Sequence, residues 1–245
     1  METYREWTVS DTCHVTHNTK HIVLSPPWTC HQVVGPGHHV QWRTSRENTE
    51  IVRSYTPVNI LDGDGDGKLH FLIKIYSDGA LTPYVGSLAV GDKVNISDTS
   101  GTFSMSQIPS SPDAEVYLLA AGTGITPMLS ILHALKTFKQ KPKLRLFTFD
   151  RTIKDIIWKD QIQKYQSANS SWMKVTHVVS SDEFGWEDEI GKISEALLRK
   201  YIEDKTEVKS RWAAVCGPPG FNREAVRLLK DCFSFVDKTV HVFEG

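Results

Sequence analysis

The stretch Ala120-Ala121-Gly122-Thr123-Gly124-Ile125-Thr126-Pro127-Met128 decides the class of the second half of this chain. It follows the apolar run 116–119 and precedes an amphipathic segment, which is the order of a strand, a glycine turn and a helix. Glycines in such a turn let a backbone approach a phosphate, and the helix N-terminus offers free N–H groups. Pro127 stands where the complete dinucleotide fingerprint has its third glycine. The pattern alone therefore predicts either a variant nucleotide-binding turn or a purely structural one.

From about residue 115 onward, strands and helices alternate. We expect strands at 115–121, 143–150, 173–180, 212–217 and 239–243, and helices at 127–138, 152–166, 193–202 and 222–233. Pro127 suits a first helical turn, and Asn222 is the expected N-cap of the last helix. This alternation predicts a parallel sheet with helices on both faces, whose ligands bind at the carboxyl ends of the strands. Gly122 and Gly217 both follow such ends.

Residues 1 to about 110 show a different pattern of apolar and turn-forming residues. Short apolar and β-branched runs recur between turn signals, and the expected strands are 21–24, 40–42, 51–55, 69–76 and 93–96. One short helix is expected within 84–90. Many short strands with regular turns predict a β-barrel or sandwich. The Pro- and Ser-rich segment 109–113 reads as a linker, so we divide the chain into domains 1–111 and 112–245.

Composition narrows the class of protein. The 245 residues are 40% hydrophobic and 23% charged, with a net charge of -1, which gives no case for nucleic-acid binding. The four scattered cysteines form no CxxC pair, which disfavours a disulfide framework, a metal site and an iron–sulfur cluster. No apolar run approaches the ~20 residues of a membrane helix, and residues 1–6 are no secretion signal. We therefore expect a cytoplasmic protein without an integral membrane segment.

Two sequence features invite a metal site. His14, His17 and His21 would share one face of a helix, but the β-branched residues among them favour a strand that scatters them. The run 62–67 (DGDGDG) begins like a calcium loop, yet the twelfth position is Ile73 and not the bidentate Glu that the loop requires. We expect no metal, and interpret the second feature as a solvated hairpin turn.

Further candidate ligand-binding residues lie in both halves. In Arg53-Ser54-Tyr55-Thr56-Pro57, strand alternation puts Arg53 and Tyr55 on one face. Arg offers a planar fork for phosphate, and Tyr can stack on a ring system; the alternative is an exposed surface strand. Lys74 lies in a strand that looks buried, and 79–82 forms a second small-residue turn. Cys216, at a strand end, either packs in the core or faces a ligand.

Together these residues resemble the cytochrome b5 reductase branch of the ferredoxin–NADP reductase superfamily. The matching segments run in the family's order over nearly the whole chain: the flavin motif Arg53-Ser54-Tyr55-Thr56, the strand 72–76, the turn 79–82, and the nucleotide motifs Gly122–Pro127 and Cys216–Pro219. Segments 155–158 and 226–229 are most similar to the reductase module of soluble fusions between a cytochrome b5 and its reductase. No haem-binding module occurs in this sequence, so the chain would be an excised domain or a shorter relative.

The resemblance implies an antiparallel β-barrel that binds FAD, followed by a parallel α/β domain that binds NADH or NADPH. Arg53 would hold the FAD pyrophosphate, Tyr55 would lie against the flavin, and Thr56 would contact it near N5. The implied cofactor-binding residues are Arg53, Ser54, Tyr55, Thr56, Leu72, Ile73, Lys74, Ala80, Leu81, Thr82, Gly122, Thr123, Gly124, Thr126, Arg151, Ser180, Cys216, Gly217, Pro218 and Phe221. Thr56 and Cys216 would lie at the reacting atoms, Cys216 as a packing and positioning residue.

The implied activity is hydride transfer from NAD(P)H to FAD, followed by single-electron transfer to a haem protein such as cytochrome b5, in cis or in trans. Catalysis is then mainly positioning, because the cofactors carry the chemistry. The alternatives are a stand-alone flavin or quinone reductase of the same superfamily, and a non-catalytic scaffold that has lost the flavin. The resemblance also implies a monomeric protein. Its expected location is the cytoplasm, including the cytoplasmic surface of the endoplasmic reticulum.

Two positions depart from the family pattern. NADH-specific relatives usually carry an Asp at the end of the third α/β strand, where this chain has Ser180, and Arg151 adds a positive charge nearby. We therefore expect NADPH to be accepted as well as NADH. The flavin-phosphate turn has Ala80-Leu81 where many relatives have Lys-Met, so we expect FAD to be lost more easily.

Overall fold

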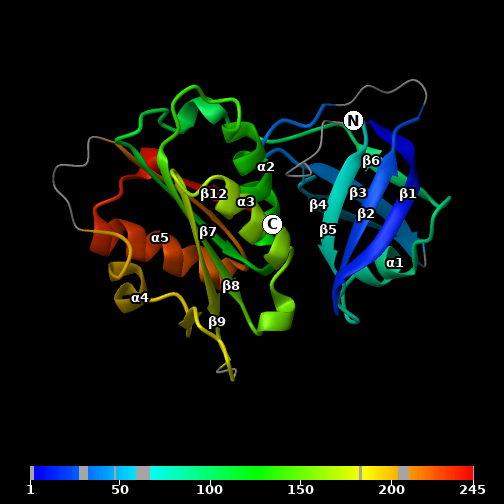
Figure 1. The fold of residues 1–245 in the computed structure, drawn as a ribbon. Coiled ribbons are helices and arrows are strands. Elements are labelled where there is room, and N and C mark those ends of the chain that lie inside the picture. Colours follow the sequence, from blue (N-terminus) through cyan, green and yellow to red (C-terminus); the bar gives the residue numbers. More distant parts are fainter. Residues whose placement is uncertain are drawn as a thin grey trace.

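The chain folds around two six-stranded sheets, one in each half of the sequence (Figure 1). The structure is a computed structural model that describes residues 3–27, 33–46, 48–58, 67–181, 184–203 and 210–244. Cys30 and residues 62–66, most of the run interpreted as a solvated hairpin turn, lie outside these ranges. The predicted two-domain class, an antiparallel β domain followed by a parallel α/β domain, is confirmed.

The first sheet is antiparallel, with strand order β4-β3-β6-β1-β2-β5. Its strands are β1 (Tyr4–Thr16), β2 (Thr19–Ser25), β3 (Val40–Arg46), β4 (Thr49–Tyr55), β5 (Leu69–Lys74) and β6 (Lys93–Ser97). Val58, just beyond β4, donates its N–H to the His70 carbonyl of β5 at 2.8 Å, which brings the two edges of the sheet together. Trp7, Trp42 and Phe71 are fully buried inside it.

The expected strands of this half are present, and the sequence analysis missed β1, the longest of them. His14 lies on β1 and His21 on β2, so the histidines are in strands and not on a helix face, but His17 lies in the turn between two strands and not within one strand. Lys20 pairs with His14 and His21 pairs with Cys13, so the two strands are antiparallel neighbours. The short helix α1 (Thr82–Ser87) begins slightly earlier than expected, with a proline in its first turn.

The second sheet is parallel, with order β10-β9-β8-β7-β11-β12. Its strands are β7 (Glu115–Ala121), β8 (Lys143–Asp150), β9 (Met173–Val179), β10 (Glu189–Ile190), β11 (Arg211–Cys216) and β12 (Val240–Phe243). The helices are α2 (Ile125–Leu135), α3 (Lys159–Ala168), α4 (Glu195–Arg199) and α5 (Pro219–Phe233). Short 3-10 turns are η1 (Met105–Gln107), η2 (Gly122–Gly124), η3 (Ile153–Asp155) and η4 (Asp237–Thr239).

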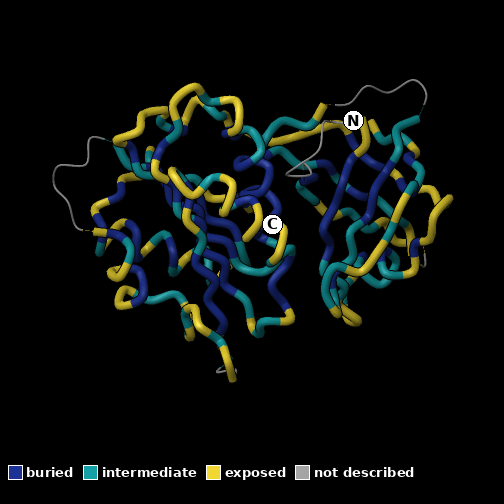
Figure 2. Tube along the Cα trace, in the orientation of Figure 1, coloured by how far each residue is buried: buried dark blue, intermediate teal, exposed yellow. Residues whose placement is uncertain are grey.

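Helices cover both faces of this sheet, as predicted. One apolar cluster contains residues of α2 and α3, and another contains residues of α4 and α5. Helices α2 and α3 lie on the side that faces the first sheet (Figure 1). The first cluster also includes Leu72 and Phe103 from the β domain, so the two domains share a buried contact. Between these helices the strands of the second sheet form a largely buried centre (Figure 2).

Two of the predicted helices differ from the observed ones, one in its first residue and one by an interruption. The last helix starts at Pro219 rather than at Arg223, so Asn222 lies inside it and donates its N–H to the Pro218 carbonyl; the N-cap prediction was wrong. Pro219 explains the earlier start, since its ring presets the helical φ and its missing N–H costs nothing there. The helix expected at 152–166 is split into η3 and α3, because Trp158 takes the left-handed conformation with φ 53°.

The segment between β6 and β7 contains the expected linker, and the boundary between residues 111 and 112 stays a prediction. None of the helices in the described part of the chain combines the length and the apolar character needed to cross a bilayer. Across the same residues, no three His, Cys, Asp or Glu side chains gather in a way that could hold a metal ion.

Candidate functional site

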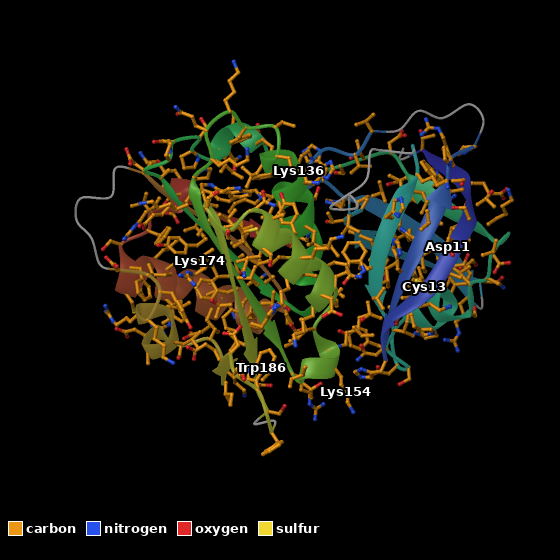
Figure 3. All side chains as sticks on the ribbon, viewed as in Figure 1. Asp11, Cys13, Lys136, Lys154, Lys174 and Trp186 are labelled. Atoms are coloured by element: carbon orange, nitrogen blue, oxygen red, sulfur yellow. The ribbon has the colours of Figure 1, made fainter. Side chains whose placement is uncertain are left out.

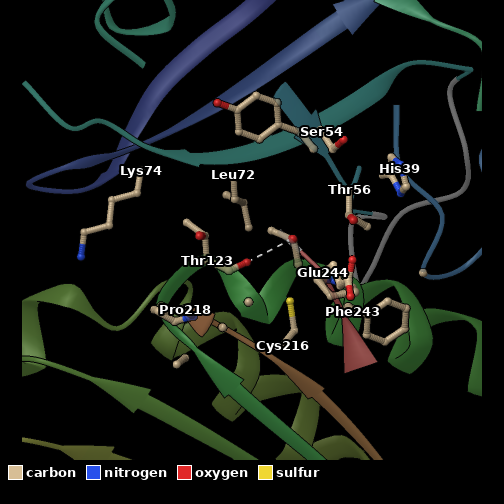
Figure 4. A pocket seen from close by; sticks show the side chains of 18 of the residues that line it. His39, Ser54, Thr56, Leu72, Lys74, Thr123, Cys216, Pro218, Phe243 and Glu244 are labelled. Atoms are coloured by element: carbon tan, nitrogen blue, oxygen red, sulfur yellow. Dashed lines mark hydrogen bonds between the residues drawn. The ribbon is translucent and has the colours of Figure 1, made fainter. Parts of the chain in front are cut away.

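A cavity of about 900 Å³ lies between the two domains. Strands β4 and β5 supply one wall, and the carboxyl ends of β7, β8, β11 and β12 supply the other. In Figure 4, Lys74, Leu72 and Thr56 face Thr123, Pro218 and Cys216 across this space. The volume is at the upper end of the range for ligand sites, about 300–1,000 Å³. The position agrees with the rule that parallel sheets bind ligands at the carboxyl ends of their strands.

The α/β wall is built from two glycine turns that meet. Gly122 has φ +54°, a conformation that glycine adopts without strain, and the space where a side chain would stand is open. Gly124 is tightly packed, because a Cβ atom on it would come within 2.0 Å of the Cys216 carbonyl oxygen. A Cβ on Gly217 would come within 2.8 Å of the Ala121 Cβ. These turns expose backbone to the cavity without side chains in the way.

Cys216 ends β11 at the floor of the cavity. Its side chain is 7% exposed, and burial raises the pKa of its thiol to about 12. The thiol therefore stays neutral at physiological pH and is a poor nucleophile. This agrees with the predicted packing and positioning role.

Two threonines lie at the start of α2. The Thr126 hydroxyl donates to the Thr123 carbonyl at 3.1 Å, and both residues line the cavity. Thr126 is buried, so this bond holds its side chain in place where the α/β wall turns toward the β domain. Pro127 follows inside the helix and also lines the cavity.

On the opposite wall, β4 presents Arg53 and Tyr55 as its alternation predicts. The Arg53 guanidinium is exposed to the cavity and donates to the Val52 carbonyl at 2.7 Å. Tyr55 packs edge-on against Trp42, with ring centroids 5.7 Å apart. Burial raises the pKa of Tyr55 to about 12, against the opposing effect of Arg53. Its hydroxyl therefore stays protonated and can donate a hydrogen bond.

Lys74 ends β5 and lines the cavity, but its ammonium group is already engaged. It donates to Asp155 Oδ1 of the other domain at 2.8 Å. The turn that follows is closed by Thr82, whose hydroxyl donates to the Tyr76 carbonyl and accepts from the Tyr76 N–H. Gly79 is required there, since a Cβ on it would lie 2.2 Å from the Thr82 hydroxyl.

Most of the predicted cofactor-binding residues line this one cavity. Four do not: Ala80, Leu81, Ser180 and Phe221. Ala80 is exposed, and the Leu81 side chain is 1% exposed within the core of the β domain. The Ser180 hydroxyl donates to the Arg151 carbonyl at 3.3 Å, so Ser180 and the cavity residue Arg151 are neighbours. Phe221 packs on Phe149 beneath the wall, with ring centroids 5.1 Å apart.

The structure also adds lining residues that the sequence analysis missed. Asp150 ends β8 on the cavity wall, and the strand-end rule could have found it. Burial raises the pKa of Asp150 to about 7, a shift that Lys74 opposes and Asp155 reinforces. The aromatic pair Phe103 and Phe243, with centroids 5.3 Å apart, comes from distant parts of the chain, and no local pattern indicates it.

The lining has the chemistry that a flavin dinucleotide and a nicotinamide dinucleotide require. Arg53 and Arg151 supply positive charge for phosphates, and the open space beside Gly122 lets a phosphate approach the backbone. Leu72 and the aromatic residues supply apolar surface for flat rings. The residues present therefore fit both groups.

Comparison with known proteins agrees with this assignment. The protein-family model for the oxidoreductase FAD-binding domain matches residues 6–105. The family model for the oxidoreductase NAD-binding domain matches residues 118–227. The solved structure of the CS-b5R domains of human Ncb5or (NAD+ form) superimposes with a TM-score of 0.91 at 33% identity, covering 100% of this chain and 70% of that one. The chain belongs to the cytochrome b5 reductase family. FAD and a nicotinamide dinucleotide, NADH or NADPH, are accordingly its cofactors.

Curated members of the family extend the comparison. Cytochrome b5 reductase 4 of Rattus norvegicus is 35% identical over 249 residues, which cover 98% of this chain and 47% of the relative. The chain thus spans about half the length of this curated relative. The cytochrome b5 reductase domain of Ulva prolifera nitrate reductase shares the fold, with a TM-score of 0.84 at 18% identity.

Proposed function

We propose that this chain is an NAD(P)H oxidoreductase that passes electrons through FAD to a haem protein of the cytochrome b5 type. The observation that carries the proposal is a cavity lined by both domains, with the Arg53–Thr56 motif on one wall and the glycine turns on the other. When bound, FAD accepts two electrons as hydride from the nicotinamide and releases them singly. The protein has to hold the two cofactors in contact and keep water from the reacting atoms.

The residues divide this work by domain. Arg53 would pair with the FAD pyrophosphate, Tyr55 would pack against the flavin, and Thr56 would hydrogen-bond it near N5. Leu72 and Ile73 lie on the same wall. From the other domain, Gly122, Thr123, Gly124 and Thr126 would admit the dinucleotide, and Cys216, Gly217 and Pro218 would lie beside the nicotinamide. No side chain has to act as an acid or a nucleophile, in agreement with the neutral Cys216 thiol.

We also propose that the chain uses NADPH as well as NADH. Arg151 directly follows β8 and Ser180 directly follows the adjacent strand β9, and the Ser180 hydroxyl donates to the Arg151 carbonyl. Ser181 donates to the same carbonyl at 2.9 Å. This corner carries the Arg151 cation and has an uncharged serine where a carboxylate would repel a 2′-phosphate.

The proposed acceptor is a cytochrome b5 domain, either on the same polypeptide or on a separate protein. We propose a monomer that works in the cytoplasm, including the cytoplasmic surface of the endoplasmic reticulum. Light scattering of the purified protein would test the first statement, and fractionation of cells that express it would test the second.

One series of spectra tests the activity. The purified protein should be yellow, and anaerobic NADH or NADPH should bleach its flavin absorbance. Reoxidation by oxidised cytochrome b5 should then be at least as fast as by a quinone at equal concentration. A colourless protein that gains no absorbance from added FAD would contradict the proposal. Rapid reoxidation by quinone with none by cytochrome b5 would favour the stand-alone reductase instead.

A further inference from the structure

Asp155 is a buried carboxylate that joins the two domains. It lies in η3 of the α/β domain, and its side chain is 7% exposed. Oδ1 accepts from Lys74 Nζ at 2.8 Å and from Asn18 Nδ2 at 3.2 Å, and both donors belong to the β domain. Oδ2 accepts from Thr152 of its own domain at 2.8 Å. The residue therefore contacts β5 and the β1–β2 turn at once.

The ionisation state of Asp155 also suits its contact with Lys74. Burial alone would raise the pKa of Asp155, but the hydrogen bonds from Lys74, Thr152 and Asn18 lower it to about 2. The carboxylate is thus ionised across the physiological range. His17 Nε2 lies 3.9 Å from Oδ1, and Asp150 is the other carboxylate close to Lys74. An ion pair whose carboxylate is buried and accepts three hydrogen bonds tolerates little displacement of either partner.

A second contact flanks this pair. The Trp158 indole of the α/β domain packs edge-on against His21 of β2, with ring centroids 5.5 Å apart. His21 Nε2 in turn lies 3.1 Å from His70 Nδ1 on β5. Trp158 is the left-handed residue immediately before α3, three residues beyond the end of η3. The segment 155–158 therefore touches the β domain at both of its ends.

We propose that Asp155 is a positioning residue that fixes the α/β domain against the β domain through Lys74 and Asn18. The consequence for the reaction rests on the proposed function. The nicotinamide would be carried by one domain and the flavin by the other, so the angle between the domains sets the distance between the reacting atoms. A misplacement of 1 Å can cost about a hundredfold in rate. Lys74 stands on the cavity wall, so the contact is made beside the reacting groups.

The first test measures the position of the domains directly and needs no cofactor. Cys13 on β1 and Lys174 on β9 are exposed and lie on different domains (Figure 3). Spin labels at Cys13 and at K174C, with Cys30 and Cys232 changed to Ser, report the interdomain distance in apo and FAD-loaded protein. We expect Asp155→Leu and Lys74→Met each to broaden the distance distribution, and Lys74→Arg to keep it narrow. Asp160→Asn, an exposed carboxylate in the first turn of α3, is the matched control and should change nothing.

The second test is the anaerobic rate of flavin reduction by NADPH at saturation. We expect Asp155→Leu and Lys74→Met each to lower it about tenfold or more. The double variant should be no slower than the worse single one, because both act through one contact. If Asp155→Leu fails to fold, Asp155→Asn and Lys74→Met carry the test.

An unchanged distance distribution in the folded variants would overturn the proposal, whatever happens to the rate. A rise in KM alone, with an unchanged distribution, would also overturn it, since Lys74 would then act by direct contact with the dinucleotide. A protein that binds no FAD would refute the proposed function, while the distances in the apo protein would still decide the role of Asp155.

Discussion

Gly124 and the Cys216 carbonyl oxygen are so close that a Cβ atom on the glycine would stand 2.0 Å from that oxygen. Strands β7 and β11 are parallel neighbours, with Ala120 paired to Cys216, so the turns that follow them emerge side by side. The glycine is needed for this close packing as much as for any ligand. The same contact brings the two nucleotide turns together as one wall of the cavity.

Gly124→Ala should therefore destabilise the protein even without cofactors. We expect a loss of about 1–3 kcal/mol in the free energy of unfolding, the usual cost of overpacking. Gly220→Ala is the matched control, since the nearest atom to a Cβ there is 4.0 Å away and the residue lies in a helix. It should be neutral or stabilising by about 0.5–1 kcal/mol. Urea unfolding of the apo proteins measures both, and equal effects would contradict the packing argument.

Arg53→Ala should yield protein that purifies with little flavin. A hydrogen bond to a charged group contributes about 1.5–3 kcal/mol, or roughly 10- to 150-fold in affinity. Arg43→Ala on the neighbouring strand is the control, because Arg43 stacks on Tyr4 outside the cavity lining. Absorbance at 450 and 280 nm gives the flavin content. Stoichiometric FAD in the Arg53 variant would count strongly against the assigned site.

Asp150 should make stability depend on pH. Its pKa is raised from 3.8 to about 7, mainly by burial, so the folded protein binds a proton that the unfolded chain releases. This contribution lowers stability progressively as pH rises from about 4 to about 7, and the loss is complete above that range. Asp150→Asn removes the titration. Relative to the wild type, the apo variant should gain more stability at pH 8 than at pH 5; the same difference at both values would refute the shift.

Asp155 contributes to the pH dependence of stability with the opposite sign, because its pKa in the folded protein is lowered to about 2. Its contribution is present above pH 4 and is lost only as pH falls toward 2. The two carboxylates therefore act in separate pH windows, and the Asp150 experiment can be run without interference from Asp155.

Thr126→Ala should slow hydride transfer more than it weakens dinucleotide binding. The change removes the bond to the Thr123 carbonyl, which holds the start of α2 at the cavity wall. We expect kcat to fall several-fold while KM stays nearly constant, a pattern of positioning loss. Thr137→Ala, which removes a similar hydroxyl bond beyond the end of α2, is the control. Equal losses in kcat and in dinucleotide affinity would show that the turn is only a phosphate cradle.

Arg151→Ala should reduce kcat/KM for NADPH by about tenfold and leave that for NADH nearly unchanged. The reason is that only NADPH carries a 2′-phosphate for the guanidinium to pair with. Lys154→Ala supplies a control that removes an exposed cation from the same segment, outside the cavity lining. A hundredfold preference of the wild type for NADH would refute the proposal on cofactor use.

Local patterns predicted much of the fold. The apolar run and glycine turn at 116–128, and the alternation after them, placed five strands of the parallel sheet within a residue or two, but the two-residue edge strand β10 was missed. The predictions from local patterns were wrong where one residue overrides the helix propensity of its neighbours. Pro219 starts α5 earlier than expected, and Trp158, in the left-handed conformation, splits the helix expected at 152–166. The long strand β1 was missed because its polar composition hides it; its register with β2 and β6 is set by pairing that no local window contains.

The sequence by itself determined the two domain classes, the cofactor family and most of the cavity lining, because strand ends and glycine turns are encoded by neighbouring residues. Only the tertiary structure decided how the walls meet. Gly124 against Cys216, Phe103 against Phe243, and Lys74 against Asp155 each join residues at least 81 positions apart. Such contacts depend on packing and electrostatics between segments far apart in the chain, and the raised pKa of Asp150 depends on burial in the folded protein.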